Sequence, residues 1–198
     1  MSAGKITLFP LANVKLSSLA VSPGPIVWAM TNSPDGVGAF DPADGSFHVV
    51  TTTHAPSDGV LVANGSVWLI VSGDSPPTVV RRPLTLPPGA PFKQVAGPFE
   101  QGWLAMTLAH ASDDSIWVAL SKNPGTSADA ARLERIVGPP RRAARPGLAQ
   151  PKVSIDLPHG WNPFSVVPAG PGSVYVVSRT SNTTSVLGRV QLKSGALT

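Results

Sequence analysis

Cysteine is absent from this chain of 198 residues, and charged residues make up only 13% of it. Without cysteine there are no disulfides, no thiolate metal sites and no cysteine nucleophile, and such a composition fits a reducing compartment. Every apolar run is interrupted well before the roughly 20 residues needed to cross a bilayer, and the N-terminal segment holds no apolar stretch of signal-peptide length. We therefore expect a soluble, cytoplasmic protein without a membrane partner.

Glycine and proline are abundant instead. The 19 glycines and 22 prolines interrupt the chain too often for long helices, whereas a hydrophobic content of 42% is too high for a disordered chain. A chain of this length fits one domain of ordinary size, which buries roughly 70% of the surface that its unfolded form exposes. These properties predict short strands and turns around a substantial core.

The positive charge is confined to one segment. The formal net charge is +4, and the segment 138–152 holds four basic residues and no acidic one, so the rest of the chain is neutral. A nucleic-acid-binding surface usually combines basic residues with aromatic ones, and this segment has no aromatic residue. We interpret it as a solvated loop, with anion contact as the alternative, and do not expect nucleic acid as a partner.

An internal repeat runs through the chain. Four times, an apolar segment is followed by a turn of small residues and by a second segment centred on an aromatic residue. The segments are 17–31, 58–72, 103–121 and 163–179, and their aromatic residues are Trp28, Trp68, Trp117 and Tyr175. A third segment follows in each repeat, and a fourth in the first three. The pattern predicts four-stranded units of about 50 residues.

These units predict an all-β protein, a β-propeller of four blades per chain. The blades cover approximately residues 10–53, 54–97, 98–157, and 158–198 with residues 4–9. Residues 127–137 have helical propensity, but the repeat assigns them to a strand. Because the last repeat lacks a fourth strand, we expect residues 4–9 to supply it and so to join the two ends of the chain.

Two closures satisfy this pairing. The chain either forms a compact ring of four blades or shares an eight-bladed ring with a second copy, as a homodimer with two-fold symmetry. A ring of four blades requires strongly twisted sheets, which favours the homodimer. Both closures remove the exposed strand edges at which β-proteins aggregate.

The repeat resembles that of virginiamycin B lyase and related NHL-type propellers. The residues that carry the likeness are Ile6–Leu11, Phe40–Gly45, Ser66–Trp68 and Gly188–Val190. The resemblance implies a propeller fold and a lyase that opens a cyclic peptide lactone by elimination, using a divalent metal, a Glu-x-His pair and a further histidine. This chain has no Glu-x-His, because Glu100 precedes Gln101 and Glu134 precedes Arg135. The likeness therefore predicts the fold more directly than the reaction.

The candidate site lies on the loops that join the fourth strand of one blade to the first strand of the next. Counting back eight residues from the end of each first strand reaches His54, Glu100 and His159 in three equivalent loops. Two imidazoles and a carboxylate around one axis suit a divalent metal, Mg²⁺ or another, or general acid and base catalysis. The alternative is that all three are solvated loop residues. His48 and His110 are expected to be structural or exposed.

Five further residues share this predicted rim. Trp103 and Trp161 each follow a glycine at the junction of loop and strand, where an indole forms a wall for a ligand or packs between blades. Lys15, Asp58 and Asn162 are candidates for orienting a ligand, with simple solvent exposure as the alternative for each.

The favoured function is an enzyme of lyase or cyclase type that acts on a small molecule at the channel face. His54, His159 and Glu100 are its candidate catalytic or metal-binding residues. The alternative is a non-catalytic propeller that binds a protein, a glycan or a small ligand through the tryptophans. Sequence motifs of triad hydrolases, nucleotide-binding loops and zincins are absent.

Overall fold

A computed structural model describes most of the chain, in segments. The described residues are 11, 14–33, 35–52, 56–72, 76–87, 90–122, 130–137, 153–170, 173–181, 184–191 and 196–197. All regular structure in these segments is β-strand, as predicted. Among them we find no helix with the length and apolarity to cross a membrane.

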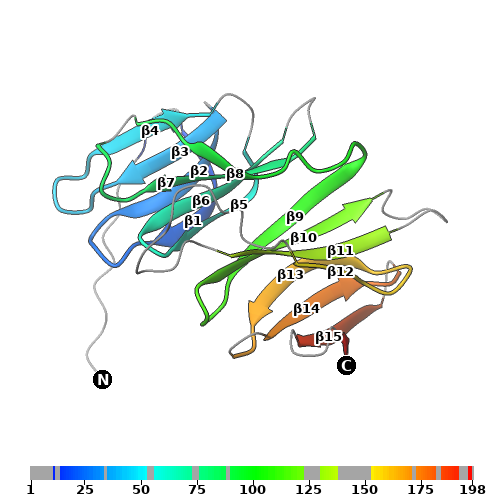
Figure 1. Ribbon diagram of the computed structural model, residues 1–198. Helices are drawn as coiled ribbons and strands as arrows, with labels where there is room; N and C mark the ends of the chain where they lie inside the picture. Colours follow the sequence, from blue (N-terminus) through cyan, green and yellow to red (C-terminus); the bar gives the residue numbers. More distant parts are fainter. Residues whose placement is uncertain are drawn as a thin grey trace, which may run out of the picture.

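The strands form four antiparallel sheets, each of four strands in sequence order, and these sheets resemble propeller blades (Figure 1). Blade 1 contains β1 (Lys15–Val21), β2 (Val27–Ser33), β3 (Asp35–Phe40) and β4 (Phe47–Thr51), and blade 2 contains β5 (Pro56–Ala63), β6 (Ser66–Val71), β7 (Thr78–Pro83) and β8 (Lys93–Ala96). Blade 3 contains β9 (Trp103–His110), β10 (Ser115–Lys122), β11 (Ala130–Val137) and β12 (Val153–Asp156), and blade 4 contains β13 (Asn162–Pro168), β14 (Ser173–Arg179), β15 (Ser185–Gln191) and β16 (Ala196–Leu197).

The repeated aromatic residues occupy the same place in every blade. Each lies on the second strand, opposite Ala20, Leu61, Ala109 and Val167 respectively on the first strand. Trp28, Trp68 and Trp117 point toward the following blade and are buried in the core between the two sheets. The sequence repeat is therefore a repeat of the interface between neighbouring blades.

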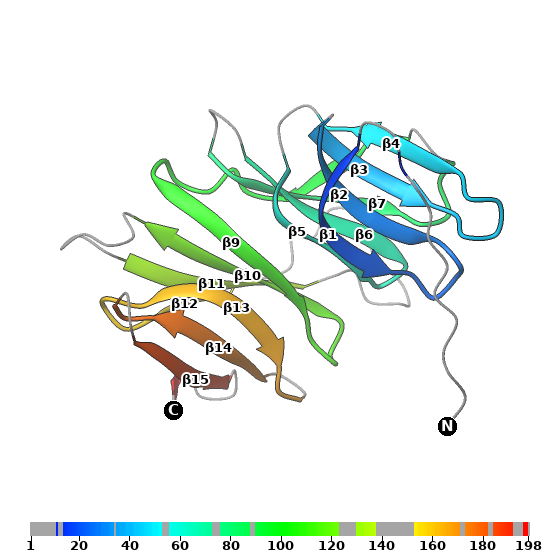
Figure 2. The ribbon, with the colours of Figure 1, turned by 180° about the vertical axis from the view of Figure 1, so that it is seen from behind.

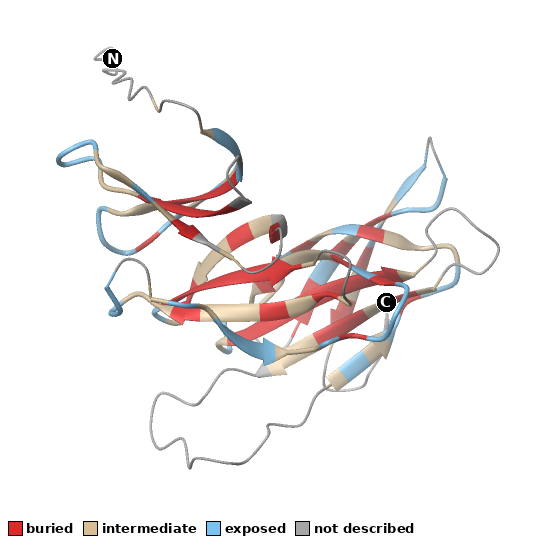
Figure 3. Cartoon of the chain, turned by 90° about the horizontal axis from the view of Figure 1, so that it is seen from above, coloured by how far each residue is buried: buried red, intermediate tan, exposed pale blue. Residues whose placement is uncertain are grey.

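Each sheet packs face to face with the next one in sequence. The first strands β1, β5, β9 and β13 contact one another in order along the inner side of this row of sheets. Figure 3 shows the buried residues, in red, along the strands, while pale blue exposed residues gather at turns and loops. Blades 1 and 4 form the two ends of the row (Figure 2).

The described part of the segment with helical propensity, residues 130–137, is a strand. All eight residues of β11 pair in register with β10, from Ala130 opposite Lys122 to Val137 opposite Ser115. Alanine, arginine and glutamate favour a helix in isolation, but pairing on both edges and burial of Leu133 outweigh that preference. The strand assignment from the repeat is confirmed.

The prediction that blade 4 lacks a fourth strand of its own is wrong. The short strand β16 pairs with β15 through Leu197 opposite Val190 and Ala196 opposite Gln191. Two residues give too little hydrophobic alternation for a strand to be recognised in the sequence. Residues 4–9, which were expected to fill this place, lie outside the described residues, as does the basic segment 138–152.

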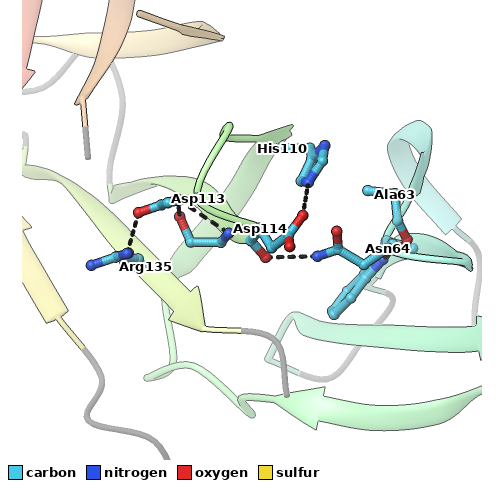
Figure 4. A network of polar contacts seen from close by, with 8 residues as sticks. Ala63, Asn64, His110, Asp113, Asp114 and Arg135 are labelled. Carbon is cyan, nitrogen blue, oxygen red and sulfur yellow. Dashed lines mark hydrogen bonds and ion pairs between the residues drawn. The ribbon is translucent and has the colours of Figure 1, made fainter. Parts of the chain in front are cut away.

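A polar network joins blades 2 and 3 at the turns between their first two strands (Figure 4). Asn64, at a positive φ of 51°, donates from Nδ2 to the backbone oxygen of Asp114 at 2.6 Å. The neighbouring Asp113 accepts bonds from the backbone and hydroxyl of Ser115 and from the guanidinium of Arg135. Burial opposes ionisation of Asp113, but these bonds and the positive charge outweigh it, so that its pKa is below the ordinary value.

Replacing Asp113 with asparagine is expected to lower the free energy of unfolding at neutral pH by up to about 1 kcal/mol, because solvent screens a carboxylate that is partly exposed. Because the pKa of Asp113 is lower in the folded chain, its ionisation stabilises the fold above the unfolded pKa of about 4, and this contribution disappears as the pH falls through the folded pKa. Urea unfolding from pH 7 to pH 2 measures the effect. An equal difference between wild type and Asp113→Asn at every pH would contradict the assignment.

Candidate functional site

Two described loops that lead into first strands have the same shape. In one, the backbone nitrogen of Trp103 donates to the oxygen of Glu100 at 3.2 Å, and in the other Trp161 donates to Pro158 at 3.1 Å. Each tryptophan follows a glycine with a φ above +80°, a backbone conformation that side chains disfavour. The two loops, 97–102 and 157–161, therefore present equivalent residues at the same edge of blades 3 and 4, which we call the loop edge.

This equivalence shifts the sequence alignment by one residue. Matching Trp103 with Trp161 makes His159 the equivalent of Gln101, whereas counting back from the strand ends had matched it with Glu100. The count treated Leu108 as the counterpart of Val167. Val167 pairs with the repeated aromatic residue of blade 4, however, and in blade 3 the residue that pairs with Trp117 is Ala109. Glu100 and His159 thus lie on successive loops at neighbouring positions of the turn.

Glu100 belongs to a cluster of polar side chains that the sequence did not reveal. The indole Nε1 of Trp103 donates to Glu100 Oε2 at 3.3 Å. The guanidinium of Arg132 lies over the Trp103 ring, 4.1 Å from its centroid, and its nitrogens are 3.8 Å from Glu100 Oε2 and 3.6 Å from Glu134 Oε1. We call Glu100, Trp103, Arg132 and Glu134 the Arg132 cluster. It combines a cation–π contact with two ion pairs.

The cluster runs from the interior to the surface. The side chain of Glu134 is 1% exposed and that of Arg132 20%, whereas that of Glu100 is 71% exposed. A carboxylate buried as deeply as Glu134 requires a nearby positive charge, which Arg132 supplies. The buried end therefore fixes Arg132, and Arg132 and Trp103 together orient a carboxylate that remains open to solvent.

Arg132 and Glu134 were missed because the search for a site covered only the loops that enter first strands, whereas both residues lie on a third strand. They flank Leu133, which is fully buried on the opposite face of β11. In a strand, such alternation places Arg132 and Glu134 on one face together. That spacing was the available signal, but the sequence does not show which loop the face meets.

The other predicted residues are spread along the loop edge. His159 is exposed in the loop before blade 4, and Trp161 is partly buried against the core between blades 3 and 4. Asn162 begins β13 opposite Arg179, and the exposed Lys15 begins β1 opposite Ser33. Trp103 is buried in the core between blades 2 and 3.

Two predicted site residues, the metal candidate His54 and the ligand-binding candidate Asp58, are not described in full. His54 lies outside the described residues, and the side chain of Asp58 is not described although its backbone belongs to β5. Where side chains are described, no three histidine, cysteine, aspartate or glutamate residues come together in a way that would hold a metal ion. His48 is exposed on β4, and Nε2 of His110 lies 3.5 Å from a carboxylate oxygen of Asp114.

Sequence comparisons give no match, either to a protein-family model or to a curated protein. Solved structures do match. A streptogramin B lyase structure superposes with a TM-score of 0.68 at 14% identity, covering 96% of this chain and 56% of the lyase chain. A catalytically inactive virginiamycin B lyase from Staphylococcus aureus, with quinupristin, gives 0.51 at 12% identity over 94% of this chain and 69% of its own.

A prolyl endopeptidase also matches, with a TM-score of 0.58 at 10% identity, over 87% of this chain and 24% of the endopeptidase chain. At these identities the likeness concerns the fold alone. This chain spans about 56% of the length of the streptogramin B lyase. Over nearly its whole length, the chain is similar in fold to the streptogramin and virginiamycin B lyase propellers, as the sequence resemblance predicted.

Proposed function

We propose that this propeller binds a polar small molecule at the loop edge, with Glu100 as the main contact. The observation that carries the proposal is that Glu100 is held by Trp103 and Arg132 and yet stays 71% exposed. An oriented but accessible carboxylate loses little conformational freedom when a ligand binds, which favours affinity. The two carboxylates and one guanidinium of the Arg132 cluster leave a net negative charge, which favours a ligand with ammonium or hydroxyl donors.

His159 is proposed as the second contact. The backbone nitrogen of Leu157 donates to the oxygen of Ala131 at 2.8 Å, which ties the loop 157–161 to the start of β11 and thus to the chain next to Arg132. His159 is exposed on this loop. A neutral imidazole both donates and accepts hydrogen bonds, so it complements a hydroxyl group of the ligand.

Replacing Glu100 with glutamine is expected to weaken ligand binding at least tenfold, or about 1.4 kcal/mol, because it removes the exposed charge while keeping the shape. Saturation-transfer NMR with a library of small amines and polyols provides the ligands, and titration gives their affinities. Asp44→Asn is the matched control, since Asp44 is an exposed carboxylate in the turn between β3 and β4, at the opposite edge of its blade. Hits that bind Glu100→Gln as tightly as wild type, or an absence of hits, would refute the proposal.

The second candidate is a lyase or cyclase that uses His54, His159 and Glu100. It is supported by the similarity in fold to two B lyases, one of which is in a structure with quinupristin. Quinupristin incubated with this protein, with and without Mg²⁺, is the direct test. Opening of its lactone by elimination leaves the mass unchanged and alters chromatographic retention, whereas hydrolysis adds the mass of water. Unaltered quinupristin would remove this substrate from consideration and leave the binding proposal unaffected.

A further inference from the structure

The two end blades expose apolar side chains at positions that are buried or partly buried elsewhere in the repeat. On the third strand, Val37, Val79 and Leu133 occupy the same register position in blades 1, 2 and 3, and each is 0% exposed. Leu187 is their counterpart in blade 4 and is 67% exposed. The difference arises because blades 1 to 3 each have a following blade, whereas no described residue covers this face of blade 4.

The second strand repeats the contrast. Trp28, Trp68 and Trp117 are at most 4% exposed, but Tyr175 at the equivalent position is 38% exposed. Val167, which pairs with Tyr175 on the first strand, is 47% exposed. Val167, Tyr175 and Leu187 lie on one face of blade 4, which we call the trailing face. In blades 1 to 3 the same face receives the next blade.

Blade 1 shows the complementary defect. Leu19 occupies the position of Val60 in blade 2 and Val166 in blade 4, as their pairing with the second strand shows. Val60 and Val166 are less than 10% exposed because they pack against the preceding blade, whereas Leu19 is 63% exposed. Leu16, Leu19 and Val21 are exposed on this face of blade 1, which we call the leading face.

The trailing and leading faces correspond to the two sides of one interface that the chain already contains three times. Between blades 3 and 4, Leu133 of the trailing side and Val166 of the leading side share one apolar core. Their counterparts at the ends of the chain are Leu187 and Leu19. Each end therefore has the shape and polarity that the other end requires.

We propose that a second copy of this chain covers both faces, so that two chains form a closed eight-bladed ring. The trailing face of each copy packs against the leading face of the other, which gives two identical interfaces related by two-fold symmetry. The size of the arc supports two copies, because almost the whole chain superposes on 56% of one lyase propeller chain. Four blades of this fold thus make about half of a ring, and a second half of the same kind completes it.

Replacing Leu187 with aspartate is expected to convert the protein from a dimer to a monomer. Light scattering and sedimentation at micromolar concentrations should give twice the 20.4 kDa of one chain for wild type, and the mass of a single chain for the variant. An aspartate at a surface position of the isolated chain costs little stability, and circular dichroism verifies the fold. Leu86→Asp is the control, since Leu86 is an exposed leucine in blade 2 outside both end faces, and it should leave the dimer intact.

A charge-swap mixture distinguishes this ring from other associations. Leu187→Asp and Leu19→Lys are each expected to be monomeric alone, but together to form a mixed dimer with one wild-type interface and one Asp–Lys interface. Wild-type protein that remains monomeric would overturn the proposal, as would variants that stay dimeric or a mixture that fails to associate. Glu100→Gln should leave the mass unchanged, so the ring and the proposed ligand site are tested separately.

Discussion

Replacing Trp117 with alanine is expected to lower the free energy of unfolding by about 3–5 kcal/mol. Trp117 is 0% exposed and packs in the core that joins blades 3 and 4, beside Leu133 and Val176. Removing the indole deletes apolar contacts on both sheets and leaves a cavity that two stiff β-sheets cannot close. Because stability totals only about 5–15 kcal/mol for a typical domain, this loss is a large share of it.

Tyr175→Ala is the matched control for Trp117→Ala, because Tyr175 occupies the same register position in blade 4 but lies on the trailing face. Both substitutions are made in the Leu187→Asp chain, so that association between copies does not contribute. Urea unfolding should show a loss below about 1 kcal/mol for Tyr175→Ala, since little of its burial depends on a neighbouring blade. Equal losses at the two positions would mean that the aromatic residues stabilise their own sheets and not the interfaces between blades.

This contrast also explains how much of the fold was predictable from the sequence. A large aromatic residue fills each of the three interfaces between blades, and Tyr175 repeats it on the trailing face, so these four residues marked the second strands directly. The first strands followed from them, since each ends a short turn earlier. The fourth strand of blade 4 was not predictable, because β16 has two residues and is defined by its pairing with β15.

The candidate site was less predictable than the fold, for a different reason. Glu100 and His159 were predicted as candidates because loop residues at a strand entrance are visible in the sequence. The partners of Glu100 were not, since Arg132 lies on β11, which β10 separates from β9, and only its side chain reaches across to Trp103 and Glu100. Contacts of this kind depend on three-dimensional packing and on shifts in strand register, and neither has a local sequence signal.

Replacing Arg82 with methionine is expected to lower the free energy of unfolding by about 2 kcal/mol. Arg82 is 1% exposed, and its guanidinium donates to three carbonyl oxygens of the loop after β7: Ala90 at 3.1 Å, Leu86 at 2.8 Å, and Pro87. It also lies 5.3 Å from the ring centroid of Trp28 in blade 1. Arg82 therefore holds a loop of blade 2 while it packs against the neighbouring blade.

Two opposing effects determine the size of this change. Burial lowers the pKa of Arg82 because the guanidinium is less well solvated there than in water, and methionine removes that cost. Against this, methionine loses all three hydrogen bonds, and bonds from charged donors are roughly twice as strong as those from neutral ones. Leu86 and Pro87 are exposed, so their freed carbonyl groups regain water and recover part of the loss. The balance favours arginine by about the value of one charged hydrogen bond.

The adjacent Arg81 provides the control for this balance. It lies 5.6 Å from the ring centroid of Trp68 but is only partly buried, so Arg81→Met should change stability by about 0.5 kcal/mol or less. Urea unfolding of the two variants compares the contribution of Arg82, which donates hydrogen bonds to a loop, with that of Arg81, which lies over the Trp68 ring. If Arg82→Met were as stable as wild type, desolvation would cancel the three bonds, and Arg82 would serve to position the loop without stabilising the blade.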